Sequence, residues 1–120
     1  KKISVNLVSI IVVNFNNSRF INQCIISLKK QNFKKIEIIF VDNQSSDNSL
    51  QKISSYRNVK IIKNKRKFLF GSFNQMDSYY QGFLKSKGEI IFFLDSDDYF
   101  AKHKVKMVIK KFSVKIFFLP

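Results

Sequence analysis

Three carboxylates lie within four positions of one another, directly after a run of five apolar residues at positions 90–94. The acids are Asp95, Asp97 and Asp98. A short apolar run bounded by polar residues predicts a buried strand, and open α/β sheets bind their ligands at the carboxyl ends of such strands. Carboxylate oxygens suit Mg²⁺ or Mn²⁺, which bridge one or two protein carboxylates to substrate phosphates. The alternative interpretation is a solvated turn in which Asp97 or Asp98 caps the next helix.

The composition is that of a folded, strongly basic protein. The chain has 120 residues, of which 45% are hydrophobic, so we expect a single domain over residues 1–120 with its own core. It carries 22 basic and 8 acidic residues, a formal net charge of +14. Such basicity is typical of proteins that bind nucleic acid, an anionic membrane surface or phosphorylated substrates. The lysines are scattered along the chain, so we expect most of them to form a solvated surface.

Cys24 is the single cysteine, which excludes an internal disulfide and a cysteine-based zinc site. It falls among the apolar residues of a predicted helix, so a core position is expected. The apolar run at positions 8–13 is too short to span a membrane, and we see no export signal. A cytoplasmic location is expected, and peripheral attachment to the anionic inner face of a membrane is compatible with it.

Apolar runs and helical spacings alternate along the chain. Strands are predicted at residues 8–14, 36–41, 59–62, 89–94 and 114–119. Helices are predicted after a turn at 16–18, from Asp47 to Ser55, and over 72–85 and 102–112, with a basic loop at 63–70. This alternation predicts an α/β fold: a doubly wound, mainly parallel sheet with helices on both faces. Right-handed crossovers bring the strand ends to one edge, where Asn14, Asn16, Asp42 and the acids after residue 94 should converge.

Three segments together carry a resemblance to a known family. They are residues 8–16 (VSIIVVNFN), 36–49 (IEIIFVDNQSSDNS) and 87–98 (KGEIIFFLDSDD). In order and spacing they resemble the N-terminal, nucleotide-sugar-binding half of inverting family 2 glycosyltransferases, which have the Rossmann-like GT-A fold. The resemblance runs from residue 8 to about residue 100.

The resemblance implies a set of residues that bind the nucleotide sugar. Asn14 and Asn16 would lie beside the nucleotide, and Asp42 would accept hydrogen bonds from the base or ribose of a UDP-like donor. Asp42 could instead be a turn residue that hydrogen-bonds its own loop. Asp47 could equally cap the following helix. The implied donor-binding residues are Asn14, Asn16, Asp42, Ser45, Asn64 and Asp95.

The resemblance also identifies Asp95-Ser96-Asp97 with the Asp-x-Asp signature of the family. It implies that Asp97 is the main ligand of Mn²⁺ or Mg²⁺, that Asp95 contacts ribose or a metal-bound water, and that Asp98 assists. A bound divalent cation would neutralise the diphosphate and stabilise the leaving group.

Two regions depart from the pattern of the family. The basic segment 63–70 replaces part of a glycine-rich segment, and Tyr79-Tyr80 replace an Arg-Asn pair. Arg66 and Lys67 could contact phosphate or belong to a solvated loop.

No acid follows Asp98, so no catalytic base is identified, and the resemblance implies that the base lies in a missing C-terminal, acceptor-binding half. We therefore expect little transfer from residues 1–120 alone.

The expected function is that of a glycosyltransferase domain in polysaccharide synthesis. It would bind a UDP-sugar through the metal, for transfer to a glycan or lipid-linked acceptor. The alternative is a basic nucleic-acid-binding module without enzymatic activity, whose binding should weaken steeply with salt and need no metal. A phospho-acceptor receiver domain fits less well because the first strand ends in asparagines and not in acids.

Overall fold

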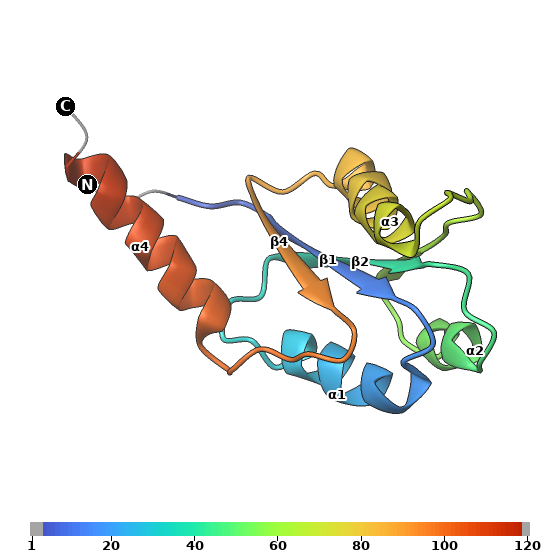
Figure 1. The fold of residues 1–120 in the computed structure, drawn as a ribbon. Helices are drawn as coiled ribbons and strands as arrows, with labels where there is room; N and C mark the ends of the chain where they lie inside the picture. Colours follow the sequence, from blue (N-terminus) through green and yellow to red (C-terminus); the bar gives the residue numbers. More distant parts are fainter. Residues whose placement is uncertain (1–3, 119–120) are drawn as a thin grey trace.

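The chain forms a four-stranded sheet with helices on both faces (Figure 1). The computed structural model describes residues 4–118, with side chains as far as residue 112. The strands are β1 (Val8–Asn14), β2 (Ile36–Asp42), β3 (Val59–Lys63) and β4 (Ile90–Asp95). The helices are α1 (Ser18–Lys29), α2 (Ser49–Ser54), α3 (Gly71–Lys85) and α4 (Lys104–Phe118).

All strand pairs are parallel, and the strand order is β3-β2-β1-β4. Asn14 at the end of β1 pairs in register with Asp42 at the end of β2, and Val13 pairs with Asp95 at the end of β4. The carboxyl ends of three strands therefore meet at one edge, as parallel pairing with crossover helices requires. The predicted α/β class and the predicted convergence of strand ends are confirmed.

Alternation along β1 divides the core into two layers. Val8, Ile10 and Val12 pack with α1 and with Ile53 of α2 on one face. Ile11 and Val13 pack on the other face, with Tyr79 of α3. Figure 1 shows α1 and α2 below the sheet and α3 above it. Because side chains alternate between the faces of a strand, this division decides which residues at the end of β1 turn toward α3.

Gly82 lets α3 lie close against the sheet. A β-carbon at this position would come within 2.4 Å of Ile11 Cγ2 and within 3.2 Å of Val41 Cγ2. Both of those side chains belong to the layer under α3. The absence of a side chain at Gly82 thus sets the distance between α3 and strands β1 and β2.

Cys24 of α1 is fully buried, as expected. Burial, together with the negative charges of Asp98 and Asp97, raises the pKa of its thiol to about 12. The thiol is therefore protonated at neutral pH and acts as a small apolar core group.

The predicted strand at 114–119 is wrong, because helix α4 continues to Phe118; Leu119 lies outside the described residues. The apolar spacing that starts the helix runs on without a break at intervals of three and four. It comprises Val105, Ile109, Phe112 and Ile116. No glycine or proline lies between Lys104 and Pro120, so nothing stops the helix at the predicted point. Within residues 4–118, no helix has the length and apolarity needed to cross a bilayer.

Candidate active site

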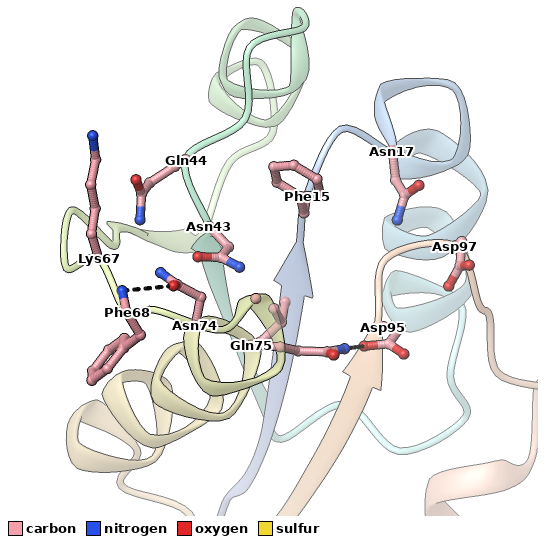
Figure 2. Close-up of a pocket in the computed structure, with 12 residues that line it drawn as sticks. Phe15, Asn17, Asn43, Gln44, Lys67, Phe68, Asn74, Gln75, Asp95 and Asp97 are labelled. Carbon is pink, nitrogen blue, oxygen red and sulfur yellow. Dashed lines mark hydrogen bonds between the residues drawn. The ribbon is translucent and has the colours of Figure 1, made fainter.

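A pocket of about 660 Å³ opens at the carboxyl edge of the sheet, beside the first turns of α3 (Figure 2). It lies where β1, β2 and β4 end, the edge at which open α/β sheets bind ligands. Its lining comprises Val13, Phe15, Asn17, Asn43, Gln44, Lys67, Phe68, Gly71, Asn74, Gln75, Asp95 and Asp97.

A buried hydrogen-bond network ties the strand ends together next to the pocket. Asn14 Nδ2 donates to Asp42 Oδ1 at 2.9 Å, and Ser96 Oγ donates to Asn14 Oδ1 at 2.7 Å. Ser45 donates to both carboxylate oxygens of Asp42, from its hydroxyl at 2.7 Å and from its backbone N–H at 3.0 Å. Asn14 and Asp42 are only 0% and 2% exposed, and neither lines the pocket. These hydrogen bonds fix the positions of the strand ends relative to one another. Direct contact of Asn14, Asp42 or Ser45 with a donor stays a prediction.

Asn16 and Asp47 join the first loop to the loop after β2. Asn16 has a positive φ of 52°, and its Oδ1 accepts the N–H groups of Ser46 and Asp47 at 2.8 and 3.3 Å. Asp47 accepts the N–H groups of Ser18 and Ser49, both at 3.0 Å, at the first residues of α1 and α2. Desolvation acts to raise the pKa of Asp47, but the hydrogen bonds from Ser49 and Ser18 outweigh it and lower that pKa. Asp47 therefore accepts the first N–H of both helices, as a capping side chain does, although the N-cap positions themselves are Asn17 and Asn48.

Asp95 and Asp97 occupy one side of the pocket, as Figure 2 shows. Asp95 Oδ1 accepts hydrogen bonds from the Tyr79 hydroxyl and from Gln75 Nε2, the latter at 3.2 Å. Burial, the hydrogen bond to Asp95 and the charges of Asp95 and Asp97 raise the pKa of Tyr79. Tyr79 therefore stays protonated and keeps donating to Asp95. The Asp97 carboxylate is exposed and has no hydrogen-bond or ion-pair partner among the described side chains, which end at residue 112.

Asp98 does not line the pocket; its N–H closes the turn by donating to Asp95 O at 3.0 Å. The alternative interpretation, that Asp97 or Asp98 caps the next helix, is wrong because that helix begins only at Lys104. Within the described part of the chain, no cluster of three His, Cys, Asp or Glu side chains is placed to hold a metal. The pair Asp95 and Asp97 nevertheless fits a Mg²⁺ or Mn²⁺ site, which typically takes one or two carboxylates and completes its shell with phosphate and water.

The basic segment 63–70 forms the opposite wall, and α3 holds it in place. Asn64 is buried away from the pocket and donates to Asp77 Oδ2 at 3.0 Å and to Ser78 Oγ at 2.9 Å. Arg66 forms an ion pair with Asp77 at 3.3 Å, which leaves Lys67 as the cation of this segment that lines the pocket. Lys67 is thus better placed than Arg66 to meet a phosphate.

Two prominent lining residues, Phe15 and Asn43, were missed by the sequence reasoning, which selected their neighbours Asn14 and Asp42. Phe15 is 56% exposed at the pocket. Asn43 Oδ1 is buried and has no hydrogen-bond partner in the described structure. Alternation along β1 separates Asn14 from Val13 and Phe15, but only the position of α3 shows that the side of Val13 and Phe15 borders the pocket.

The fold and the edge pocket define an α/β domain of the nucleotide-binding kind, with a carboxylate pair opposite a lysine. The sequence model of Glycosyl transferase family 2 matches residues 9–115. The chain therefore belongs to glycosyltransferase family 2, and the sequence-based resemblance is confirmed. This membership favours the transferase over a basic nucleic-acid-binding module.

Relatives and solved structures agree with this assignment. The Escherichia coli enzyme WfaP, a UDP-Glc:alpha-D-GlcNAc-diphosphoundecaprenol beta-1,3-glucosyltransferase, is 34% identical over 93% of this chain and 44% of its own length. The structure of Staphylococcus aureus TarS 1-349 in complex with UDP-GlcNAc is 29% identical, with a TM-score of 0.72 over 87% of this chain and 30% of that one.

A more distant structure shares the fold alone. The mannosyltransferase PcManGT from Pyrobaculum calidifontis, in complex with GDP-Man and Mn²⁺, is 16% identical, with a TM-score of 0.67 over 82% of this chain and 29% of that one. The first curated relatives are much longer proteins: the chain spans 32%, 40% and 17% of their lengths.

Proposed function

We propose that the edge pocket binds a nucleotide-diphosphate sugar, a UDP-sugar, together with Mg²⁺ or Mn²⁺, as the donor site of a glycosyltransferase. The observation that carries the proposal is the arrangement of the pocket. Asp95 and Asp97 stand on one side, Lys67 and the start of α3 on another, and Phe15 and Asn43 at the ends of β1 and β2.

The nucleobase of the donor fits the end of the pocket formed by Phe15 and Asn43. The exposed ring of Phe15 offers an apolar face to a planar base. Asn43 Oδ1 is a closed-off acceptor without a partner in the described structure, and rotation of the Asn43 amide would let it accept the imide N–H of uracil. A uracil nucleotide would therefore satisfy a buried group that the described structure leaves unpaired.

The diphosphate fits between the carboxylate pair and the basic wall. Asp95 and Asp97 would hold the cation, with Asp98 adding negative charge from the same turn, while Lys67 and the N–H groups that begin α3 face the phosphates from the other side. When bound, the cation supplies charge neutralisation of the diphosphate and of the departing UDP. Tyr79 and Gln75 orient Asp95 by donating to its Oδ1.

We propose that the acceptor is a glycan or a lipid-linked sugar, and that the whole protein builds a polysaccharide. WfaP, whose name specifies a diphosphoundecaprenol-linked acceptor, supports this class. In this proposal the carboxylates at the pocket hold the cation, and the base that deprotonates the acceptor lies outside residues 1–120, which the greater length of the relatives supports. The chain alone then binds donor weakly and transfers little sugar.

A cytoplasmic location with peripheral attachment to an anionic membrane completes the proposal, supported by the net charge of +14.

Calorimetric titration of the purified chain with UDP, with and without Mn²⁺, tests the donor site. We expect binding that requires Mn²⁺ and that weakens at least about tenfold in Asp97→Ala, because a charged ligand contact contributes roughly 1.5–3 kcal/mol. Asp98→Ala is the graded comparison and should lose much less affinity, since it removes an exposed acid that adds charge from the same turn but does not line the pocket. Equal UDP binding with and without metal, or equal losses in the two variants, would contradict the assignment.

A further inference from the structure

The outward side of α3 carries a continuous apolar stripe. Its members recur at intervals of three and four, so they share one face of the helix. They are Phe73, Met76, Tyr80, Phe83 and Leu84, and each is between 46% and 65% exposed. The opposite face of α3 packs on the sheet through Ser78 and Gly82. A surface helix in a folded domain normally places its apolar stripe inward, so this exposed one marks an interaction surface.

The stripe continues into the loop that precedes α3. Leu69 is 89% exposed, and Phe70 is exposed with its ring packed edge-on against Phe73 at 5.6 Å. The apolar surface therefore runs from the lip of the pocket, where Phe68 lies, along the length of the helix.

Positive charge brackets the stripe at both ends. In the sequence, Lys63, Lys65 and Lys67 precede the helix, Lys85 is its last residue and Lys87 follows it. Asp77 is the single acid of α3, and its carboxylate is engaged by Arg66 and Asn64. An apolar helix face with cations around it and no free acid is complementary to an anionic lipid surface, where apolar groups enter the acyl boundary and cations meet the headgroups.

We propose that the outward face of α3 and the basic segment 63–70 dock the protein onto an anionic membrane, with α3 lying in the plane of the interface. The proposal deepens the proposed function and rests on it for its biological sense. Asn74 and Gln75, one turn into the same helix, line the donor pocket. Docking through α3 therefore sets the pocket beside the headgroups, where the diphosphate of a lipid-linked acceptor resides.

Co-sedimentation with vesicles tests the docking surface. We expect the chain to bind vesicles of phosphatidylcholine and phosphatidylglycerol, to bind pure phosphatidylcholine much less, and to weaken between about 0.1 and about 0.5 M salt. Replacing two stripe residues with glutamine, Met76→Gln with Leu84→Gln, should weaken binding about tenfold or more while helical content is retained.

Matched variants separate this surface from general basicity. Met107→Gln on α4 removes a methionine of similar exposure, 58% against 65% for Met76, and should leave vesicle binding unchanged. Lys63→Gln with Lys65→Gln should weaken binding about tenfold or more, at about fivefold per cation, whereas Lys110→Gln with Lys111→Gln removes the same charge from α4 with a smaller effect.

The outcomes distinguish docking from donor binding. Absence of binding to the anionic vesicles by the folded chain, or equal losses in the α3 and α4 variants, overturns the proposal. Self-association that Met76→Gln abolishes, seen by sedimentation velocity, assigns the stripe to a second copy of the chain and also overturns it. Asp97→Ala should lose UDP and keep vesicle binding, and Met76→Gln with Leu84→Gln should do the reverse, so failure of one function leaves the other measurable.

Discussion

Asn43 carries an acceptor atom that has no hydrogen-bond partner among the described residues. Its Oδ1 is buried without a partner, a state that costs about 1–3 kcal/mol and that a ligand N–H would relieve. We expect Asn43→Ala to weaken UDP binding about tenfold and to reduce the preference for UDP over CDP, because N3 of cytosine is an acceptor where that of uracil is a donor.

Asn32 supplies the matched control for this measurement. Its Oδ1 is also buried without a partner in the described structure, but Asn32 follows α1 and does not line the pocket. Calorimetry should give Asn32→Ala the parental affinity for UDP and the parental preference over CDP. An unchanged ratio of the UDP and CDP affinities in Asn43→Ala would show that another residue recognises the nucleobase.

At the scale of elements, the packing of α3 against the sheet positions both the pocket and the exposed apolar stripe of α3. We expect Gly82→Ala to lower the free energy of unfolding by about 1–2 kcal/mol, because the added methyl group overlaps Ile11, whose branched side chain has little freedom to move. The gain in helix propensity of about 1 kcal/mol offsets part of the loss. Urea unfolding followed by circular dichroism measures the difference.

Gly71→Ala is the control, because a β-carbon at the first residue of α3 meets nothing within 4 Å. Its stability should equal or exceed that of the parent. If Gly82→Ala were as stable as Gly71→Ala, the close approach of α3 to β1 would not constrain the fold.

At the scale of the whole molecule, Glu37 connects β1, β3 and the segment before β4 at the end of the sheet opposite the pocket. Its carboxylate accepts Ser9 Oγ of β1 at 2.5 Å, the N–H of Lys87 at 2.7 Å and Lys60 Nζ of β3 at 3.2 Å. Desolvation acts to raise the pKa of Glu37, but these hydrogen bonds and the charge of Lys60 lower it below the ordinary value of 4.5.

The lowered pKa gives stability a definite dependence on pH. The unfolded chain takes up the proton first as the pH falls, so the stabilisation by Glu37 is present above pH 4.5 and is lost as the pH falls through the lower, folded value. We expect Glu37→Gln to lower the melting temperature at pH 7 and to flatten its decline between about pH 5 and about pH 3.

Glu89→Gln serves as the comparison, since Glu89 is exposed and accepts one backbone N–H, that of Asn6 at 2.6 Å. Melting curves of the two variants and the parent across this pH range form the measurement. A parallel decline in Glu37→Gln and the parent would exclude Glu37 as a source of acid sensitivity.

The sequence by itself determined the class of fold, the family and the edge at which the site lies. Apolar runs such as residues 36–41 and 90–94 are local signals of buried strands, and parallel pairing brings their carboxyl ends together whatever the details of packing. For that reason Asp42 and Asp95 were correctly expected to converge on one edge of the sheet.

The tertiary structure decided which neighbour at each strand end faces the pocket. Asn14 and Asp42 look as suitable as Phe15 and Asn43 in the sequence, but alternation on β1 and the loop after β2 turn the first pair into the hydrogen-bond network. It also decided that the apolar face of α3 points outward. Orientation and exposure depend on contacts between distant segments, such as Gly82 against Ile11, and no local pattern of residues contains them.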